Sequence, residues 1–275
     1  MAADSAIGAV QWLAADVATT AYPVDVGFPV KGGVFFCVGI QSATDAASEI
    51  LDLQLGAGVA SSGTDRRSIH GSNNDADGTA RTQMSYRTDC VIQQHIHGDV
   101  APTGLLDFSV SGNTFILTVD DQGIQNASVM YLVWGGDVTC ETFEIAEPAA
   151  IGNVTATLTG PLAALTPSAV VLFGSKCTGA APTFEATIDN GFSIGFASSS
   201  TAADNFVAVY NSDDAAGVPD VDSYTQSGEC IAQILEAGGT GVNARAKLDS
   251  FGVGQVVINF LEVLTAGRKT IGLAF

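Results

Sequence analysis

The sequence predicts an all-β protein of two tandem antiparallel β-sandwich (jelly-roll-like) domains that arose by internal duplication. Three observations lead to this prediction: short apolar segments separated by Gly, Asn, Asp and Ser, an ordered series of matches between the two halves, and the lack of sustained helical periodicity. The chain has 275 residues, of which 47% are hydrophobic and 14% charged, so it can bury one or two full cores.

The expected strands are short and alternate along the chain with turn residues. Leu51, Leu53 and Leu55 recur with a period of two, which places one face of a strand inward. The first half has such segments at 33–38, 50–55, 90–96, 105–110, 114–119 and 128–134. The second half has them at 169–173, 192–196, 205–210, 231–235, 254–261 and 270–275. This spacing is typical of two packed antiparallel sheets with Greek-key or jelly-roll topology.

The second half of the chain echoes the first at a nearly constant separation, which drifts slowly as small loop insertions would make it. The matching pairs include Phe35/Phe173, Tyr86/Tyr224, Cys90/Cys230 and Leu106/Leu248. An ordered series of this kind indicates tandem duplication. We therefore expect the halves to superpose, with Tyr86 over Tyr224 and Cys90 over Cys230.

These matches divide the chain into an N-terminal arm at 1–21, a first sandwich at 22–147 and a second at 148–275. The boundary is placed near Glu147, because Glu141, Glu144, Glu147 and Pro148 raise the polarity between the two copies.

The charge excludes several classes of function. Ten Lys and Arg against 29 Asp and Glu give a net charge of −19, which repels phosphate and makes nucleic acid an unexpected partner. Apolar runs end well short of the roughly 20 residues of a membrane span, and the N-terminus lacks a secretory signal. The five cysteines include no Cys-x-x-Cys pair, so we expect reduced core residues in a protein made in a cytoplasm.

Two histidines form one candidate metal site. His95 and His97 are alternate residues of an expected strand, so their side chains share a face and suit Zn²⁺, Ni²⁺ or Cu²⁺. His70, Asp99 or a neighbouring subunit would have to complete the coordination. The alternative is a solvent-facing pair on a half-exposed strand.

A second candidate site is a turn. Asn73, Asp75 and Asp77 precede Gly78 in the pattern that opens a calcium loop. The twelfth position is Met84 instead of Glu, so the segment is no EF-hand. It is either a Ca²⁺ or Na⁺ site or a turn stabilised by its own Asp and Asn side chains.

Four arginines make up much of the positive charge and fall between the expected strands of the first half. They are Arg66, Arg67, Arg81 and Arg87. Arginine suits interfaces because its planar guanidinium pairs with carboxylates. We expect a contact with another subunit or with a capsid, with intramolecular pairing to Asp65, Asp75 and Asp77 as the alternative. In the first case replacement by Glu would weaken assembly and leave the monomer folded.

Several segments resemble a repeat found in structural proteins of tailed phages and related viruses. In the first copy these are Gly27-Phe28-Pro29, Val34-Phe35-Phe36, Leu106-Asp107-Phe108, Phe115–Leu117 and Tyr131–Gly136. The second copy departs from the pattern, with Leu165-Thr166-Pro167 in place of Gly-Phe-Pro and no closing Gly-Gly.

The resemblance implies a β-sandwich in each repeat and a non-enzymatic role in building or decorating a virion assembled in the host cytoplasm. We expect a capsid decoration or vertex protein with no catalytic residues, and no cofactor beyond a bound cation. Its expected partners are itself, as a homotrimer, and other virion proteins. The alternatives are a tail or fibre component, and a host-attachment protein that binds a glycan.

Overall fold

The computed structural model describes residues 3–39, 52–74, 82–95, 103–123, 125–187, 189–198, 201, 204–213, 221–234, 242–264 and 267–275. These residues form 21 β-strands and no α-helix, which confirms the all-β prediction. Among them there is accordingly no helix of the length and apolarity needed to cross a membrane.

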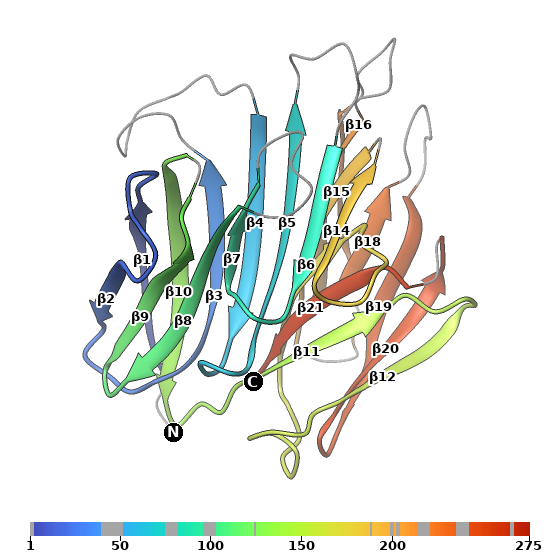
Figure 1. The fold of residues 1–275 in the computed structure, drawn as a ribbon. Helices are drawn as coiled ribbons and strands as arrows, with labels where there is room; N and C mark the ends of the chain where they lie inside the picture. Colours follow the sequence, from blue (N-terminus) through green and yellow to red (C-terminus); the bar gives the residue numbers. More distant parts are fainter. Residues whose placement is uncertain are drawn as a thin grey trace.

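The strands form four antiparallel sheets, two in each half of the chain (Figure 1). Sheet A has the order β1 (Ala3–Trp12), β10 (Ala127–Gly136), β3 (Val30–Gly39), β4 (Asp52–Ala60), β5 (Arg66–Asn74), β6 (Thr82–Arg87), β14 (Thr183–Thr187). Sheet B has the order β2 (Ala21–Asp25), β9 (Thr114–Asp121), β8 (Gly104–Ser111), β7 (Ile92–Gln94). Sheet C has the order β11 (Glu141–Ala146), β21 (Lys269–Ala274), β13 (Val170–Ser175), β15 (Asp189–Ala197), β16 (Asn205–Asp213), β17 (Val221–Ser227). Sheet D has the order β12 (Gly152–Thr157), β20 (Gln255–Glu262), β19 (Val242–Gly252), β18 (Ile231–Ile234).

The two halves have the same topology. When β14 is set aside, sheets C and D repeat the strand order of sheets A and B, with β11 in the place of β1 and β21 in the place of β10. In each unit the first three strands and the last two alternate between the two sheets, as in a jelly roll. The strands between them run as meanders. The strand β14 has no counterpart among the described strands of the first unit, and it extends sheet A by pairing with β6.

The expected N-terminal arm and domain boundary are wrong. Residues 3–12 form a full strand of sheet A, paired along its length with β10. The matching strand of the second unit is β11, which pairs with β21 and begins at Glu141. The first unit is therefore 3–136 and the second 141–275. The acidic segment misled the prediction because Glu141 and Glu144 belong to an edge strand whose Phe143 and Ile145 are buried.

The alignment of the two units differs by one residue from the one expected. Phe35 pairs with Gly58 and lies in the core of the first unit, and the residue in the same place in the second unit is Leu172, which pairs with Gly195. Phe173 points to the opposite face, into the contact between the units. A shift of one residue along a strand exchanges its two faces.

The same shift separates the other expected pairs. Tyr86 lies in the contact between the units, whereas Tyr224 packs inside the second unit. The backbone amide of Cys230 donates to Ala246, as that of Val91 donates to Leu106, so Cys230 takes the place of Val91 and not that of Cys90. The tyrosines and cysteines do not superpose as predicted.

A glycine and an aromatic residue have exchanged places between the units. Gly8 on β1 pairs with Tyr131 on β10, whose ring fills the space where a Cβ atom of Gly8 would lie. At the equivalent position Phe143 pairs with Gly272, and its ring covers that glycine. Each unit therefore fills the same space from the opposite strand, as expected of copies that diverged within one fold.

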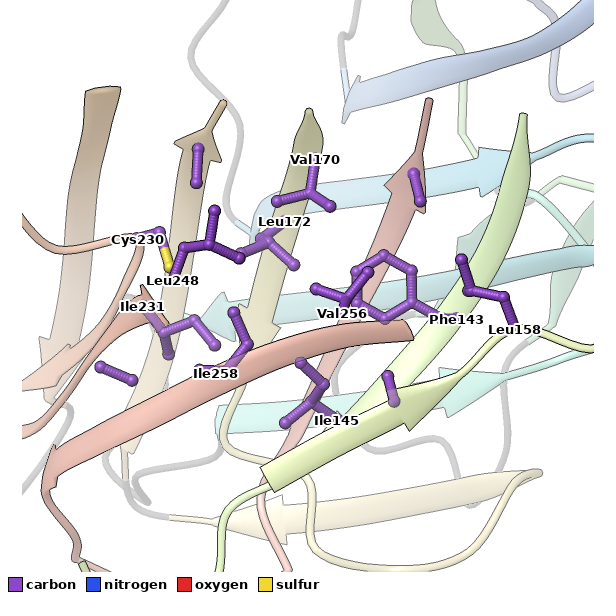
Figure 2. Packing of buried hydrophobic residues seen from close by; sticks show 14 of the residues in the cluster. Phe143, Ile145, Leu158, Val170, Leu172, Cys230, Ile231, Leu248, Val256 and Ile258 are labelled. Atoms are coloured by element: carbon purple, nitrogen blue, oxygen red, sulfur yellow. The ribbon is translucent and has the colours of Figure 1, made fainter. Parts of the chain in front are cut away.

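The four sheets stack in the order B, A, C, D around three hydrophobic layers. Phe35, Phe108 and Phe115 lie in the core between sheets A and B. Figure 2 shows the core between sheets C and D, where Leu172, Leu248 and Ile258 converge. The third layer joins the outer faces of sheets A and C and includes Val34, Val59, Tyr86, Phe173, Ile271 and Leu273. The two sandwiches are thus packed back to back. All five cysteines are buried and unbridged.

Two equivalent glycines allow close approach between the sheets of each unit. A Cβ atom on Gly58 would overlap the carbonyl oxygen of Val91, and one on Gly195 would overlap that of Cys230. Each backbone crossing therefore requires a residue without a side chain.

We expect Gly58→Ala and Gly195→Ala each to lower the free energy of unfolding by roughly 1 to 3 kcal/mol or more, because the backbone must move to admit the methyl group. The control is Gly63→Ala, whose Cβ atom would meet its nearest neighbour, the Phe108 oxygen, at 3.4 Å. Urea denaturation followed by fluorescence measures all three. Equal midpoints for Gly58→Ala and Gly63→Ala would contradict the close approach.

Candidate functional site

The fold brings two of the three histidines together in a buried pocket of the first unit. The Nδ1 atom of His70 and the Nε2 atom of His95 are 2.6 Å apart, and the Nδ1 atom of His95 is 2.9 Å from the Ser72 hydroxyl. Both rings are fully buried, at 1% and 0% exposure. We call this chain of three side chains and the buried polar residues around it the histidine pocket.

The pocket is formed by β5 and the short strand β7 above it. Ser68, His70 and Ser72 alternate on β5 and point toward sheet B. The neighbours of His70 in the sheet are Gly56 on β4 and Ser85 on β6, and Gly56 leaves room for the imidazole ring. His95 follows directly after β7.

Burial determines the protonation of the pair. Removal from water lowers the pKa of His95 to about 3, and it lowers the pKa of His70 well below its ordinary value, with the neighbouring His95 as a second cause. Both rings are therefore neutral at pH 7, and the ring N–H of one donates a hydrogen bond to the unprotonated nitrogen of the other. The Cys90 thiol lies 3.1 Å from the Ser68 hydroxyl of β5, and burial raises the pKa values of Cys90 and Cys37 to about 12.

Several polar atoms of the pocket have no hydrogen-bond partner among the described residues. They are His70 Nε2, Gln54 Oε1, Ser85 Oγ and Gln93 Oε1. Buried polar atoms are normally paired, and each one left unpaired costs about 1 to 3 kcal/mol. The pocket therefore lowers stability unless small polar molecules such as water complete it.

The second unit has an apolar cluster at the same place. Its members are Val207, Val209, Ala232 and Ile234, which occupy the positions of Ser68, His70, Gln93 and His95. The second sandwich thus has the same fold with aliphatic residues here. The polar residues of the first unit are a property of that unit and not a requirement of the fold.

The predicted metal site stays a prediction. The structure places His70, one of the residues expected to complete the site, beside His95. His97 and Asp99 lie outside the described residues. Within the described part of the chain, no three His, Cys, Asp or Glu side chains converge as metal ligands. The two facing nitrogens are hydrogen-bonded to each other, so a metal ion would have to replace that hydrogen bond.

The predicted cation turn falls almost wholly outside the described residues. The backbone of Asn73 belongs to β5 and pairs with Thr82. Asp75 and Asp77 are not described, so the calcium or sodium prediction is untested.

Arg66 and Arg67 lie on β5 and Arg87 lies on β6, not between strands, and all three pair within the chain. Arg66 forms an ion pair of 3.1 Å with Asp107, and it donates to the carbonyl oxygens of Asp89 and Phe108. Arg87 binds both carboxylate oxygens of Asp89, at 2.7 and 2.6 Å. These partners differ from the acidic residues expected from the sequence. Arg81 lies outside the described residues.

Arg67 connects the two units. It donates to the Thr142 hydroxyl at 3.1 Å and lies 3.5 Å from the Glu144 carboxylate, both on β11. Glu144 also accepts hydrogen bonds from Tyr86 and from Lys269. Burial alone would raise the pKa of Glu144, but these donors hold it below its ordinary value. The contact predicted for Arg67 with another subunit is thus occupied by the neighbouring unit of the same chain.

Sequence reasoning missed two sets of residues. The first is the rest of the histidine pocket, because its Ser and Gln residues lack the apolar alternation used to find strands. The second is a group of exposed apolar side chains on sheets A and C, including Ile7 at 82% and Phe206 at 44% exposure. No sequence signal distinguishes these from core residues.

A surface hollow of about 390 Å³ lies beside the linker between the units. It is lined by Asp137, Val138, Thr139, Leu162, Leu165, Thr166, Ser168 and Phe275. The Phe275 ring is its one aromatic group, and it packs edge-on against Trp134 with centroids 4.6 Å apart. The ring is therefore held in place by a contact within the protein.

Comparisons with known proteins identify no family. No protein-family model and no curated protein matches the chain. A solved structure described as "Crystal structure of HCR/D-Sa-GBL1/C" aligns with 98% of this chain and 93% of its own, at 7% identity and a TM-score of 0.14. A score this low carries no argument about fold or function.

The histidine pair should make folding sensitive to acid. A histidine whose pKa is lowered by folding takes up its proton in the unfolded state first, so stability falls as the pH drops below about 6.5. We expect a loss of roughly 1 to 2 kcal/mol per histidine between pH 7 and pH 5. Urea denaturation at several pH values measures it.

The control is His70→Val combined with His95→Ile, which installs the residues of the second unit. This variant should lose most of the dependence on pH. An equally steep dependence in the variant would show that other groups are responsible.

We expect Arg66→Glu to destabilise the folded chain by about 1 to 3 kcal/mol, because it leaves Asp107 and two backbone carbonyls without their donor. This differs from the expectation that reversal of charge here leaves the monomer intact. Lys31→Glu, at an exposed position with the same change of charge, is the control. Thermal unfolding measures the stability of both variants. An equal loss of stability in the two would indicate that net charge is the cause.

Proposed function

We propose that this chain is a non-enzymatic structural protein of a virus particle, placed on the capsid exterior as a decoration or vertex protein. The main support for the proposal is the packing of the two units. Two copies of one sandwich bury the outer faces of their large sheets against each other. Its segments also resemble repeats of phage structural proteins. A tail or fibre component is the alternative within the same class.

The charge supports a place on the outside of a particle. A net charge of −19 disfavours contact with packaged nucleic acid. Arg66, Arg67 and Arg87 are bound to carboxylates of the same chain, so these three do not form a free basic cluster. A protein of this kind is best suited to a surface that faces other proteins and solvent.

A host-attachment role through a glycan has less support. Carbohydrate sites combine exposed aromatic faces with polar side chains, and the aromatic ring of the one hollow described here packs against Trp134. The inferred role is therefore assembly and not recognition of a sugar.

Quantitative mass spectrometry of purified particles tests the proposal. A decoration protein should be present in a simple ratio to the major capsid protein, because it follows the symmetry of the capsid lattice. A few copies per particle would indicate a tail or attachment protein instead. Absence from purified particles would refute the structural role.

A further inference from the structure

The strand β1 is the longest strand at an edge of the described sheets. Eight strands lie at the ends of the four sheets, and seven of them have only three to seven residues. The eighth, β1, has ten residues, and all ten pair with β10 in one continuous register without a bulge. It forms the outer side of sheet A (Figure 1).

The free side of β1 offers backbone groups for further pairing. Alternate residues of an antiparallel edge strand direct their N–H and C=O groups away from the sheet. Within the described part of the chain, the backbone of β1 pairs with β10, and no backbone hydrogen bond from another segment reaches residues 3–12. The strand is also held in place, because Ala6, Val10 and Trp12 pack on the core between sheets A and B. It is therefore a preformed template for one more strand.

The equivalent strand of the second unit lacks such a free side. The backbone amide of Thr142 on β11 donates to the Asp65 carboxylate at 2.9 Å, so a residue of the first unit occupies that edge. The Glu141 carboxylate accepts hydrogen bonds from three backbone amides within residues 159–162, which holds this segment near the start of the strand. The duplicated edge is thus covered in the second unit and open in the first.

Other edges carry features that discourage pairing. The strand β2 has Pro23 at its centre, which has no N–H to donate. The strand β14 has five residues and carries Glu185. Proteins commonly protect the edges of sheets with proline, charge or short length. In β1, the eight residues from Ser5 to Trp12 include no charged residue and no proline.

We propose that β1 pairs antiparallel with β1 of a second copy of this chain about a two-fold axis, so that the two A sheets join into one continuous sheet. A row of free backbone groups requires a strand as its partner, and two identical antiparallel strands are self-complementary. The inference goes beyond the proposed structural function, since it depends only on the edge itself. Its product is a dimer, in contrast to the homotrimer expected from the resemblance to phage repeats.

The distribution of charge favours a second copy at this edge. Copies with a net charge of −19 repel one another, so a contact between them requires a region with few carboxylates. Asp4 is the one acidic residue of β1. In a pair centred on Ile7, antiparallel geometry places Asp4 opposite Val10, away from Asp4 of the second copy. No like charges therefore face each other along the paired strands.

The same pairing covers a highly exposed apolar side chain. Ile7 is 82% exposed and points to the outer face of sheet A, whereas the adjacent Ala6 faces the core. In a pair centred on Ile7, the two isoleucine side chains become cross-strand neighbours and shield each other from water. The pairing thus accounts for an isoleucine that packs on little within a single chain.

Sedimentation velocity of the purified chain tests the proposal. We expect a monomer–dimer equilibrium whose dimer fraction rises with salt, because salt screens the repulsion between acidic copies. Ile7→Lys combined with Ala9→Lys places lysines of both copies around the axis. At the lowest salt at which the unmodified chain dimerises, this variant should dimerise at least about tenfold more weakly, since like charges then face each other across the strands.

Two matched variants separate edge pairing from other causes. Ile151→Lys combined with Val253→Lys makes the same change of charge at residues that are 69% and 65% exposed and lie beside strands of sheet D. It should not weaken dimerisation. Ile7→Thr combined with Ala9→Thr introduces uncharged residues that suit a strand. It should dimerise within about threefold of the unmodified chain, because backbone hydrogen bonds carry the contact.

Single cysteines at the outward-facing positions of β1 test the register. The five native cysteines are buried, so an introduced thiol is the accessible one. Oxidation with diamide should link two copies most readily in Ile7→Cys and progressively less at positions further along the strand, such as Gln11→Cys. The reason is that the separation of equivalent residues in an antiparallel pair grows with distance from the axis.

A chain that stays monomeric at high salt and high concentration overturns the proposal, and so does a trimer. Equal weakening by the lysine and threonine pairs at positions 7 and 9 would also overturn it, because apolar side chains and not the backbone edge would then hold the copies together. Equal cross-linking along β1 would do the same. The proposed function is tested separately: a monomer found in virus particles would refute this contact alone, and a dimer absent from particles would refute the virion role alone.

Discussion

The contact between the outer faces of sheets A and C is the interaction on which the rest of the molecule depends. Seven of the ten residues of β3 and all six of β13 are buried, as in sheets covered on both sides. Phe36 packs edge-on against Phe173 with ring centroids 5.1 Å apart, and Trp134 against Phe275 in the same way. A single unit would expose this apolar face to water, so the two sandwiches form one body for energetic reasons.

The duplication provides an internal comparison for every feature of the first unit. Features present in both copies, such as Gly58 and Gly195 at the crossing of the sheets, are requirements of the fold. Features present in one copy are not. The histidine pocket is of the second kind, because aliphatic residues fill the same space in the second unit. Its buried neutral imidazoles reduce stability in acid, which makes this end of the first sandwich the more labile one.

The distribution of charge follows from the same contact. Arg67 and Lys269 both approach the Glu144 carboxylate at the edge of the layer between the units, so part of the small positive charge stabilises the junction. The equivalent positions of the other unit carry no charge, since Ala9 takes the place of Glu144 and Phe206 that of Arg67. A net charge of −19 makes copies of the chain repel one another in dilute salt.

The sequence alone determined the fold class and the duplication, because alternating apolar residues and recurring turns depend on local chemistry. It missed β1 and β5, since Ala-rich and Ser- and His-bearing strands lack strong apolar alternation. It paired Tyr86 with Tyr224, which lie on opposite faces, because similarity of residues cannot reveal a register shift of one position. Only the tertiary structure joined His70 to His95 and Arg67 to Glu144. Those contacts depend on how sheets cross and stack, and the crossing is set by packing between residues far apart in the chain.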